Sequence, residues 1–350
     1  RYVRDPEYMQ PKGSKIDACG IGFLALGLGC LQVALDTGQR KDWWGSRDIR
    51  ILAVLCVFGL LAFVIREFMT KDPVVQFRAF RDRAFAVGAW LHGVLGFVLY
   101  ASLLLVPLYL QTLLGFPAVR SGLAVSPFGI GALIALPIAG VLLNRFDPRK
   151  LLVLGFGGAA ASMFLLSGLN LNAGYWDVFW PEIVLGLGTG FMYTPLAAAS
   201  LSHLPKEEMG NATSIVNLLR NIGGSVGIAM METVVSRRTQ VHQHRLSEHI
   251  AFNDPLVRQM LQQFTAYFRQ QGADIVTATQ RAYGALYLQL QQHAAMLAFV
   301  EAFWCLGVIC AVVVPSFVFL RNSQARLKSE PEEAATVSTH SRRPQVFVHP

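Results

Sequence analysis

One stretch constrains the fold more than any other: the 23 residues from Ser121 to Leu143 contain no charged side chain. A helix rises about 1.5 Å per residue, so this stretch can cross the roughly 30 Å hydrocarbon core of a membrane. A second apolar run, Leu151–Leu171, follows after only seven residues. Neither run has the polar face, repeating every 3.6 residues, that a buried pair of helices in a soluble domain would show. We therefore predict two transmembrane helices.

The short segment between these runs predicts their orientation. Residues 144–150 include three basic side chains, and short basic loops remain in the cytoplasm. Alternation from this turn predicts eight spans and a cytoplasmic C-terminus, although the first outside loop, with Arg40, Lys41 and Arg47, is an exception. The expected spans are Asp17–Leu35, Ile49–Phe68, Phe85–Leu110, Ser121–Leu143, Leu151–Leu171, Phe179–Leu201, Asn211–Val235 and His293–Leu320.

Composition supports a membrane protein. Charged residues make up 15% of the 350 residues, whereas soluble domains contain about 25%. The net charge of +8 lies mostly in short loops between apolar runs, so we attribute it to topology rather than to nucleic-acid binding. The five cysteines lie in apolar runs without a C-x-x-C pair and are expected to pack. No catalytic set, zinc spacing or phosphate loop is present, so we expect neither an enzyme nor a cofactor.

The segment 236–292 is predicted to form a helical hairpin outside the membrane. Leu256, Met260, Phe264 and Phe268 have nearly helical spacing after Pro255, and a glycine then interrupts the pattern. A Gln-rich segment resumes the helical pattern and leads into the last span. A solvated linker is the alternative interpretation.

Arg220 is the strongest candidate for a functional side chain, because it lies near the middle of the seventh span. A charge at mid-membrane costs about 2.5–3.5 kcal/mol, so it should face the bundle interior, a partner or water. Asn217 lies one turn away on the same face. The alternative is an arginine that binds backbone carbonyls and only locks the helix.

Each of the other ionisable side chains in the spans has two possible roles. Glu182, Glu232 and Glu301 lie nearer the outer ends of their spans and are either hydrated at the interface or functional. His92, in the third span, is either a packing residue or a proton carrier. Three glycines in the sixth span, Gly186, Gly188 and Gly190, indicate close helix packing.

The turn that sets the orientation also resembles a family motif. Gly140-Val-Leu-Leu-Asn-Arg-Phe-Asp-Pro-Arg-Lys150 resembles the cytoplasmic turn of the major facilitator superfamily. Four further stretches resemble its EmrB/QacA-type branch, the drug–proton antiporters with fourteen helices: Pro73–Arg81, Ser121–Pro127, Leu185–Gly190 and Leu219–Ile228. The matching motifs run in order through most of the chain, from Asp17 to Leu320.

This resemblance implies a domain plan for an all-α polytopic membrane protein. It places two inserted helices at 16–68 and the C-terminal six-helix bundle at 85–320, with 236–292 as an extracytoplasmic helical loop. Residues 1–15 and 69–84 would be cytoplasmic loops, and 321–350 a disordered cytoplasmic tail. Six helices precede the equivalent of residues 1–15 in this family, so we expect the sequence to be a fragment lacking its N-terminal half.

The resemblance also implies a function. It predicts proton-coupled efflux of hydrophobic or cationic toxic compounds by alternating access, in the inner or plasma membrane, with the lipid bilayer, the missing half and a periplasmic adaptor as partners. The candidate substrate and proton pathway residues are Arg220, Asn217, His92, Tyr193, Tyr109 and Glu182. Alternatives are an importer or metabolite exporter on the same scaffold, or a truncated membrane protein that transports nothing.

The same resemblance points to a cytoplasmic gate at the turn, which in this family is thought to hold the two bundles together. The candidate gate residues are Gly140, Asn144, Arg145, Asp147, Arg149 and Lys150. The acid of the family motif falls on the uncharged Asn144, and Asp147 is the nearest substitute, with Arg145 and Arg149 as partners. A turn that only sets topology is the alternative.

Overall fold

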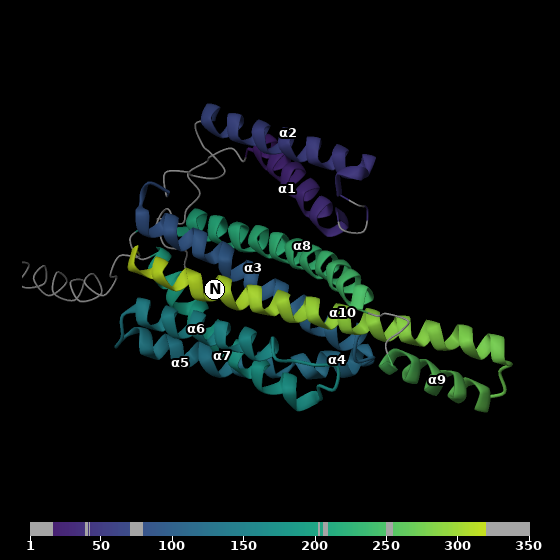
Figure 1. The fold of residues 1–350 in the computed structure, drawn as a ribbon. Helices are drawn as coiled ribbons and strands as arrows, with labels where there is room; N and C mark the ends of the chain where they lie inside the picture. The colour runs from purple at the N-terminus through teal and green to yellow at the C-terminus, as the bar shows by residue number, and fades with distance from the viewer. Residues whose placement is uncertain are drawn as a thin grey trace, which may run out of the picture.

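The computed structural model describes residues 17–38, 41, 43–70, 80–201, 204–205, 209–249 and 255–319, and the regular elements in these ranges are helices (Figure 1). They are α1 (Ala18–Gly38), η2 (Trp43–Gly45), α2 (Arg47–Met69), α3 (Arg83–Thr112), α4 (Ala118–Val125), α5 (Pro127–Leu143), α6 (Pro148–Leu166), α7 (Tyr175–Leu201), α8 (Met209–His249), α9 (Pro255–Gln270), α10 (Ile275–Val313) and η4 (Val314–Phe319). The expected loop 1–15, most of the loop 69–84 and the expected tail lie outside the described residues.

Seven of the expected spans are confirmed as helices of sufficient length and hydropathy to cross a membrane. They are α1, α2, α3, α4 with α5, α6, α7, and α10 with η4. The remaining expected span, Asn211–Val235, is the seventh along the chain. It lies within α8, which is not apolar enough among the described residues to count as a candidate span. The polar side chains of Asn217, Arg220, Asn221 and Glu232 lower its mean hydropathy. By helix length and hydropathy, seven of the eight predicted spans are therefore found among the described residues.

Close helix contacts build the bundle, and glycines make them possible. α3 packs along α8, α7 packs against both α5 and α6, and α10 packs against α8 and α6 (Figure 1). A Cβ on Gly186 of α7 would lie 2.1 Å from the carbonyl oxygen of Phe128 in α5, and one on Gly188 would lie 2.8 Å from that of Gly155 in α6. These glycines therefore serve helix packing, as the sequence predicted.

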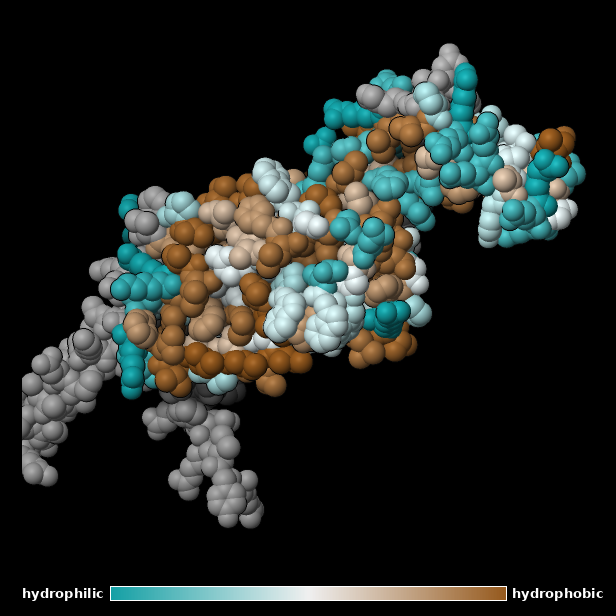
Figure 2. All heavy atoms as spheres, turned by 60° about the horizontal axis from the view of Figure 1, so that its bottom comes forward, coloured by the Kyte–Doolittle hydropathy of each residue, from teal (hydrophilic) through white to brown (hydrophobic). Residues whose placement is uncertain are grey.

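The outer surface of the bundle is apolar. Large hydrophobic side chains such as Leu133 (74% exposed) and Val312 (69% exposed) point away from the core. Figure 2 shows hydrophobic residues across the body of the molecule, with hydrophilic residues gathered toward its two ends. This distribution is what a lipid bilayer requires of the helices that cross it.

The fourth expected span has one irregular position, at Ser126 between α4 and α5, and Pro127 is the first residue of α5. Ser126 keeps helical backbone angles, with φ of −56° and ψ of −28°, so the two helices run on as one candidate span, Ala118–Leu143. Pro127 lacks an amide hydrogen and cannot donate a helical hydrogen bond, which accounts for the irregularity.

Within the described part of segment 236–292, α9 packs against the first part of α10 and forms the predicted helical hairpin. α8 continues past Val235 to His249, and α10 begins at Ile275, well before the last span (Figure 1). α9 lies beside this extension of α10 and ends before Gly272, whose φ of 90° suits glycine. Asp274 caps α10, and hydrogen bonds from Thr277 lower the pKa of its carboxyl group. We call residues 236–292 the arm.

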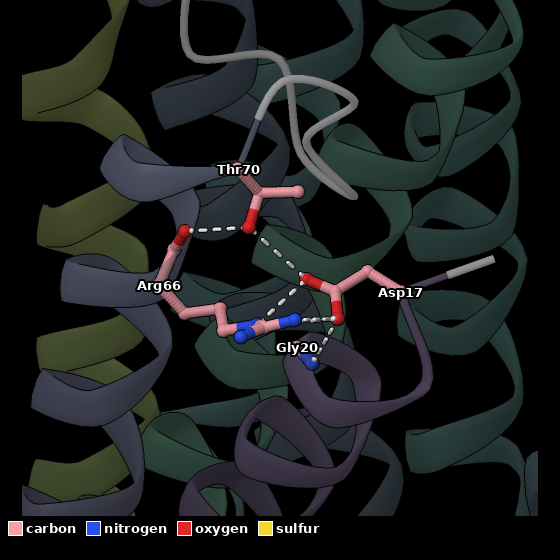
Figure 3. A network of polar contacts seen from close by, with 4 residues as sticks. All are labelled: Asp17, Gly20, Arg66 and Thr70. Carbon is pink, nitrogen blue, oxygen red and sulfur yellow. Dashed lines mark hydrogen bonds and ion pairs between the residues drawn. The ribbon is translucent and has the colours of Figure 1, made fainter. Parts of the chain in front are cut away.

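α1 and α2 form a hairpin beside α8, apart from the rest of the bundle (Figure 1). At one end, Arg66 of α2 binds the Asp17 carboxylate through Nε and Nη2 at 3.0–3.2 Å, and the Thr70 hydroxyl donates to the same carboxylate at 3.4 Å (Figure 3). At the other end, Lys41 pairs with Asp48. The two ion pairs fix the hairpin at both ends.

Candidate functional site

Arg220 and Tyr193 form the centre of the candidate site. The Nη1 group of Arg220 in α8 donates a hydrogen bond to the Tyr193 hydroxyl in α7. The guanidinium carbon lies 5.3 Å from the centroid of the Tyr193 ring, close enough for a cation–π contact. Tyr193 is 38% exposed, so this pair reaches the surface of the bundle.

Arg220 keeps unused capacity for an anion. Its Nε atom is buried and has no hydrogen-bond partner among the described residues. No described carboxylate forms an ion pair with it, and its recorded side-chain partner is the neutral Tyr193. A guanidinium has five donors and favours carboxylate or phosphate oxygens, so the site can accept an acidic group.

The backbone around Arg220 is held tightly against α3. A Cβ on Gly96 would lie 2.0 Å from the Arg220 carbonyl oxygen, and one on Gly223 would lie 2.0 Å from the carbonyl oxygen of Gly93. Tyr100 of α3 donates a hydrogen bond to the Asn221 side chain at 3.5 Å. The position of Arg220 along the bundle therefore depends on the contact between α3 and α8.

The other candidate residues lie in different surroundings. His92 is 2% exposed, and its Nδ1 atom lies 2.9 Å from the Gly88 carbonyl oxygen. Tyr109 is fully buried; its hydroxyl donates to the Asn170 carbonyl at 2.8 Å, and its ring packs edge-on against Phe299. Asn217 is half-buried on α8. The contacts of Tyr109 are those of a core residue, so it is not carried into the proposal below.

Glu182 is a buried acid on α7. It is 1% exposed, and its Oε2 atom has no hydrogen-bond partner in the part of the chain that the structure describes. It therefore lies inside the bundle rather than at the hydrated surface that the sequence left open. Burial without a partner strongly disfavours the charged carboxylate.

The basic turn between α5 and α6 is capped by its acid. The Asp147 carboxylate accepts a hydrogen bond from the Arg149 amide at 3.0 Å and so caps α6. Within the described residues, Asp147 forms no ion pair with Arg145 or Arg149. Asn144, Arg145 and Lys150 are exposed, and a Cβ on Gly140 would meet no atom within 4 Å. The expected ion pairs of Asp147 are absent in this conformation.

Sequence reasoning missed a polar cluster between α8 and α10. Arg238 Nε lies 2.7 Å from one Glu301 carboxylate oxygen, and His242 Nε2 lies 3.0 Å from the other. Arg238 and His242 are four residues apart, a helical spacing that could have indicated a shared face if α8 had been extended beyond Val235. Glu301 therefore joins the last span to the base of the arm.

The fold and this site define a polytopic membrane protein of the transporter type, and comparison gives the family. The profile of the Major Facilitator Superfamily matches residues 49–228, and the chain belongs to this superfamily. A solved bacterial homologue of the human lysosomal transporter Spinster, in an inward-facing and occupied conformation, shares the fold with a TM-score of 0.50 and 12% sequence identity. The match covers 86% of this chain and 65% of that one.

Two curated relatives are exporters or resistance proteins by name. Multidrug export protein EmrB of Haemophilus influenzae is 36% identical over 254 residues, which cover 72% of this chain and 50% of that protein. Fatty acid resistance protein FarB of Neisseria gonorrhoeae is 34% identical over 235 residues, which cover 67% of this chain and 46% of that protein. The chain thus spans about half the length of the relatives it matches, and the resemblance to EmrB-type exporters is confirmed.

Proposed function

We propose that this chain is the C-terminal part of a proton-coupled exporter of toxic hydrophobic or cationic compounds that works by alternating access. The observation that carries the proposal is the contact of Arg220, in the middle of the expected seventh span, with the uncharged Tyr193, which leaves a buried Nε without a hydrogen-bond partner among the described residues. In the complete protein, this arginine binds a carboxylate of the missing N-terminal half or an acidic group of the substrate. Asn217 and His92 are the neighbouring pathway candidates.

The experiment is a resistance assay on the full-length protein. Arg220→Ala should abolish drug resistance and proton-driven efflux at equal expression, because a charge positioned between the bundles is lost. Arg120→Ala is the matched control, since Arg120 is exposed and contacts only the Phe116 ring among the described residues. Wild-type efflux by Arg220→Ala would refute the role of Arg220.

Glu182 is the proposed proton carrier. Because burial favours its neutral form, it can take up a proton and hold it inside the membrane. Glu182→Gln should keep the fold, since it replaces an unpaired buried acid by a neutral amide of the same shape, but it should remove the dependence of efflux on the proton gradient. Retained coupling in folded Glu182→Gln would assign the proton to another residue.

A second candidate function is export of fatty acids or similar anionic amphiphiles. The unpaired guanidinium of Arg220 favours it, and one relative is named for fatty acid resistance. Resistance to a long-chain fatty acid and to a cationic dye distinguishes the two functions. Loss of fatty acid resistance alone in Arg220→Ala would favour this second function. A panel of substrates tested for transport in vesicles distinguishes both functions from an importer or a metabolite exporter on the same scaffold.

The arm is the proposed docking site for a periplasmic adaptor. α8, α9 and α10 form there a groove of about 630 Å³, lined partly by Tyr283, Tyr287 and Leu290. Deleting residues 255–271 should abolish co-purification of the adaptor while the membrane helices remain intact. Undiminished co-purification would remove the arm from this role.

The proposed topology follows the charge of the loops. We place the turn at 144–150 in the cytoplasm, α8 across the membrane as the seventh of eight spans, and the arm outside. In this arrangement residues 16–68 are the inserted hairpin and 85–320 the C-terminal bundle. The turn at 144–150 is the proposed cytoplasmic gate, with Arg145, Arg149 and Lys150 free to bind acids of the missing half.

A further inference from the structure

The arginines at the two ends of α2 differ in whether they form an ion pair. At the C-terminal end, Arg66 is paired with the Asp17 carboxylate (Figure 3). At the N-terminal end, Arg47 and Arg50 are exposed and form no ion pair with a described residue. The acid between them, Asp48, is paired with Lys41. Among the described residues, neither of these two guanidinium groups, one helical turn apart, forms an ion pair with a carboxylate, and Asp48, which Arg47 attracts at longer range, is bound by Lys41.

These two arginines line one end of an apolar groove. A cavity of about 420 Å³ is lined by Arg47, Arg50, Ile51, Val54 and Leu55. The spacing of these five residues places them on one stripe of α2, with the arginines at the end of the helix and the aliphatic side chains deeper in the span. Val54 is 68% exposed, so the helix neighbours leave this stripe open.

Along the stripe, charged side chains at the helix end are followed by aliphatic side chains, and this order matches a phospholipid, whose charged headgroup is followed by acyl chains. A phosphate at the membrane surface would meet two guanidinium groups, which bind phosphate oxygens with paired hydrogen bonds. An acyl chain continuing from it would lie on Ile51, Val54 and Leu55. Trp44, 71% exposed and next to the helix start, has the amphipathic ring that concentrates at the level of lipid headgroups.

We propose that the N-terminal end of α2 is a binding site for an anionic phospholipid. Arg47 and Arg50 hold the headgroup phosphate, and Ile51, Val54 and Leu55 hold the start of an acyl chain. The charge of the loop agrees, because residues 40–50 contain four basic and two acidic side chains. This lipid site requires that α2 lies in the membrane, and it does not depend on what the protein transports.

The test measures lipid binding by the purified chain in detergent. Native mass spectrometry follows titration with dioleoylphosphatidylglycerol, which is anionic, or with dioleoylphosphatidylcholine, which has the same acyl chains and a headgroup without net charge. The wild-type chain should prefer the anionic lipid by about thirtyfold, the size expected for two basic side chains that each contribute about 1 kcal/mol near a lipid surface. In Arg47→Gln/Arg50→Gln the preference should fall to near one.

The matched control is Arg120→Gln/Arg237→Gln. It removes the same charge from two other exposed arginines and should keep the preference. An unchanged preference in Arg47→Gln/Arg50→Gln, or an equal loss in the control, would overturn the site. Displacement of the bound lipid by millimolar inorganic phosphate would overturn the lipid assignment, because the acyl contacts would then contribute nothing. Should the double variant not fold, Arg50→Gln alone should halve the preference or more, and no change would count against the site.

Discussion

The residues that matter most here are polar groups inside an apolar bundle, and their partners decide their roles. Arg220 has a neutral partner, Glu182 has an unpartnered oxygen, and Tyr109 has a complete set of core contacts. A buried polar group without a partner costs free energy that folding alone would not retain. We therefore assign Arg220 and Glu182 to the proposed transport function rather than to stability.

Tyr193→Phe tests the contact of Arg220 directly. The substitution removes the hydroxyl that accepts from Arg220 but keeps the ring, so it should lower the free energy of unfolding by about 1 kcal/mol. Denaturant unfolding of the purified chain measures this. Tyr267→Phe on α9 is the control, because that tyrosine is 55% exposed and its recorded contact is made by its ring. Equal effects of the two variants would mean that the hydrogen bond does not contribute.

At the scale of elements, close contacts between backbones set the helix arrangement. Gly96 of α3 lies against the backbone of Arg220 in α8, and Gly223 of α8 lies against the backbone of Gly93 in α3; a Cβ on Gly96 or on Gly223 would clash. Since lipid tails are as apolar as leucine, packing of this kind is a main source of helix association in a membrane.

Gly223→Ala should separate α3 from α8. Its new Cβ would lie 2.0 Å from the Gly93 carbonyl oxygen, and such overpacking costs about 1–3 kcal/mol. Thermal unfolding in detergent gives the difference. Gly284→Ala on α10, where a Cβ meets nothing within 4 Å, should be neutral or up to about 1 kcal/mol stabilising. A neutral Gly223→Ala would show that the two helices can shift apart freely.

The α1–α2 hairpin depends on the network at Asp17. Hydrogen bonds from Arg66 hold the pKa of Asp17 below its ordinary value of 3.8. The network thus stabilises the hairpin above that pH and is lost as the pH falls through the lowered pKa. Asp17→Asn mimics the protonated state and should lower the melting temperature at pH 7. Arg66→Gln should do the same, and the double variant should be no less stable than either single one. Additive losses would mean that the two residues act independently.

At the scale of the molecule, the charged turn and the arm are expected on opposite sides of the membrane. Cysteines introduced at the exposed Arg145 and Arg269, in a chain whose five native cysteines are replaced, report the side. Arg269→Cys should react with a membrane-impermeant maleimide in intact cells, and Arg145→Cys should react only after permeabilisation. The reverse pattern would invert the proposed topology.

The class of the protein and most of its helices could be predicted from the sequence alone. Charge-free runs, basic turns and proline or glycine breaks act locally, because crossing a bilayer depends on a helix's length and its hydropathy. They were sufficient for the spans from α1 to α7 and for the last one, while the polar residues of α8 kept it below the hydropathy of a typical span.

The contacts between side chains of different helices could not be predicted in this way and became visible in the folded bundle. The pairing of Arg220 with Tyr193, the burial of Glu182 and the link between Asp17 and Arg66, 49 residues apart, depend on how each helix is rotated and packed. Sequence periodicity gives no rotation for a helix that is apolar on every side, because no polar face marks its orientation. Packing between helices therefore sets the contacts of these ionisable residues. The helix backbones come close together at positions where the residue is glycine.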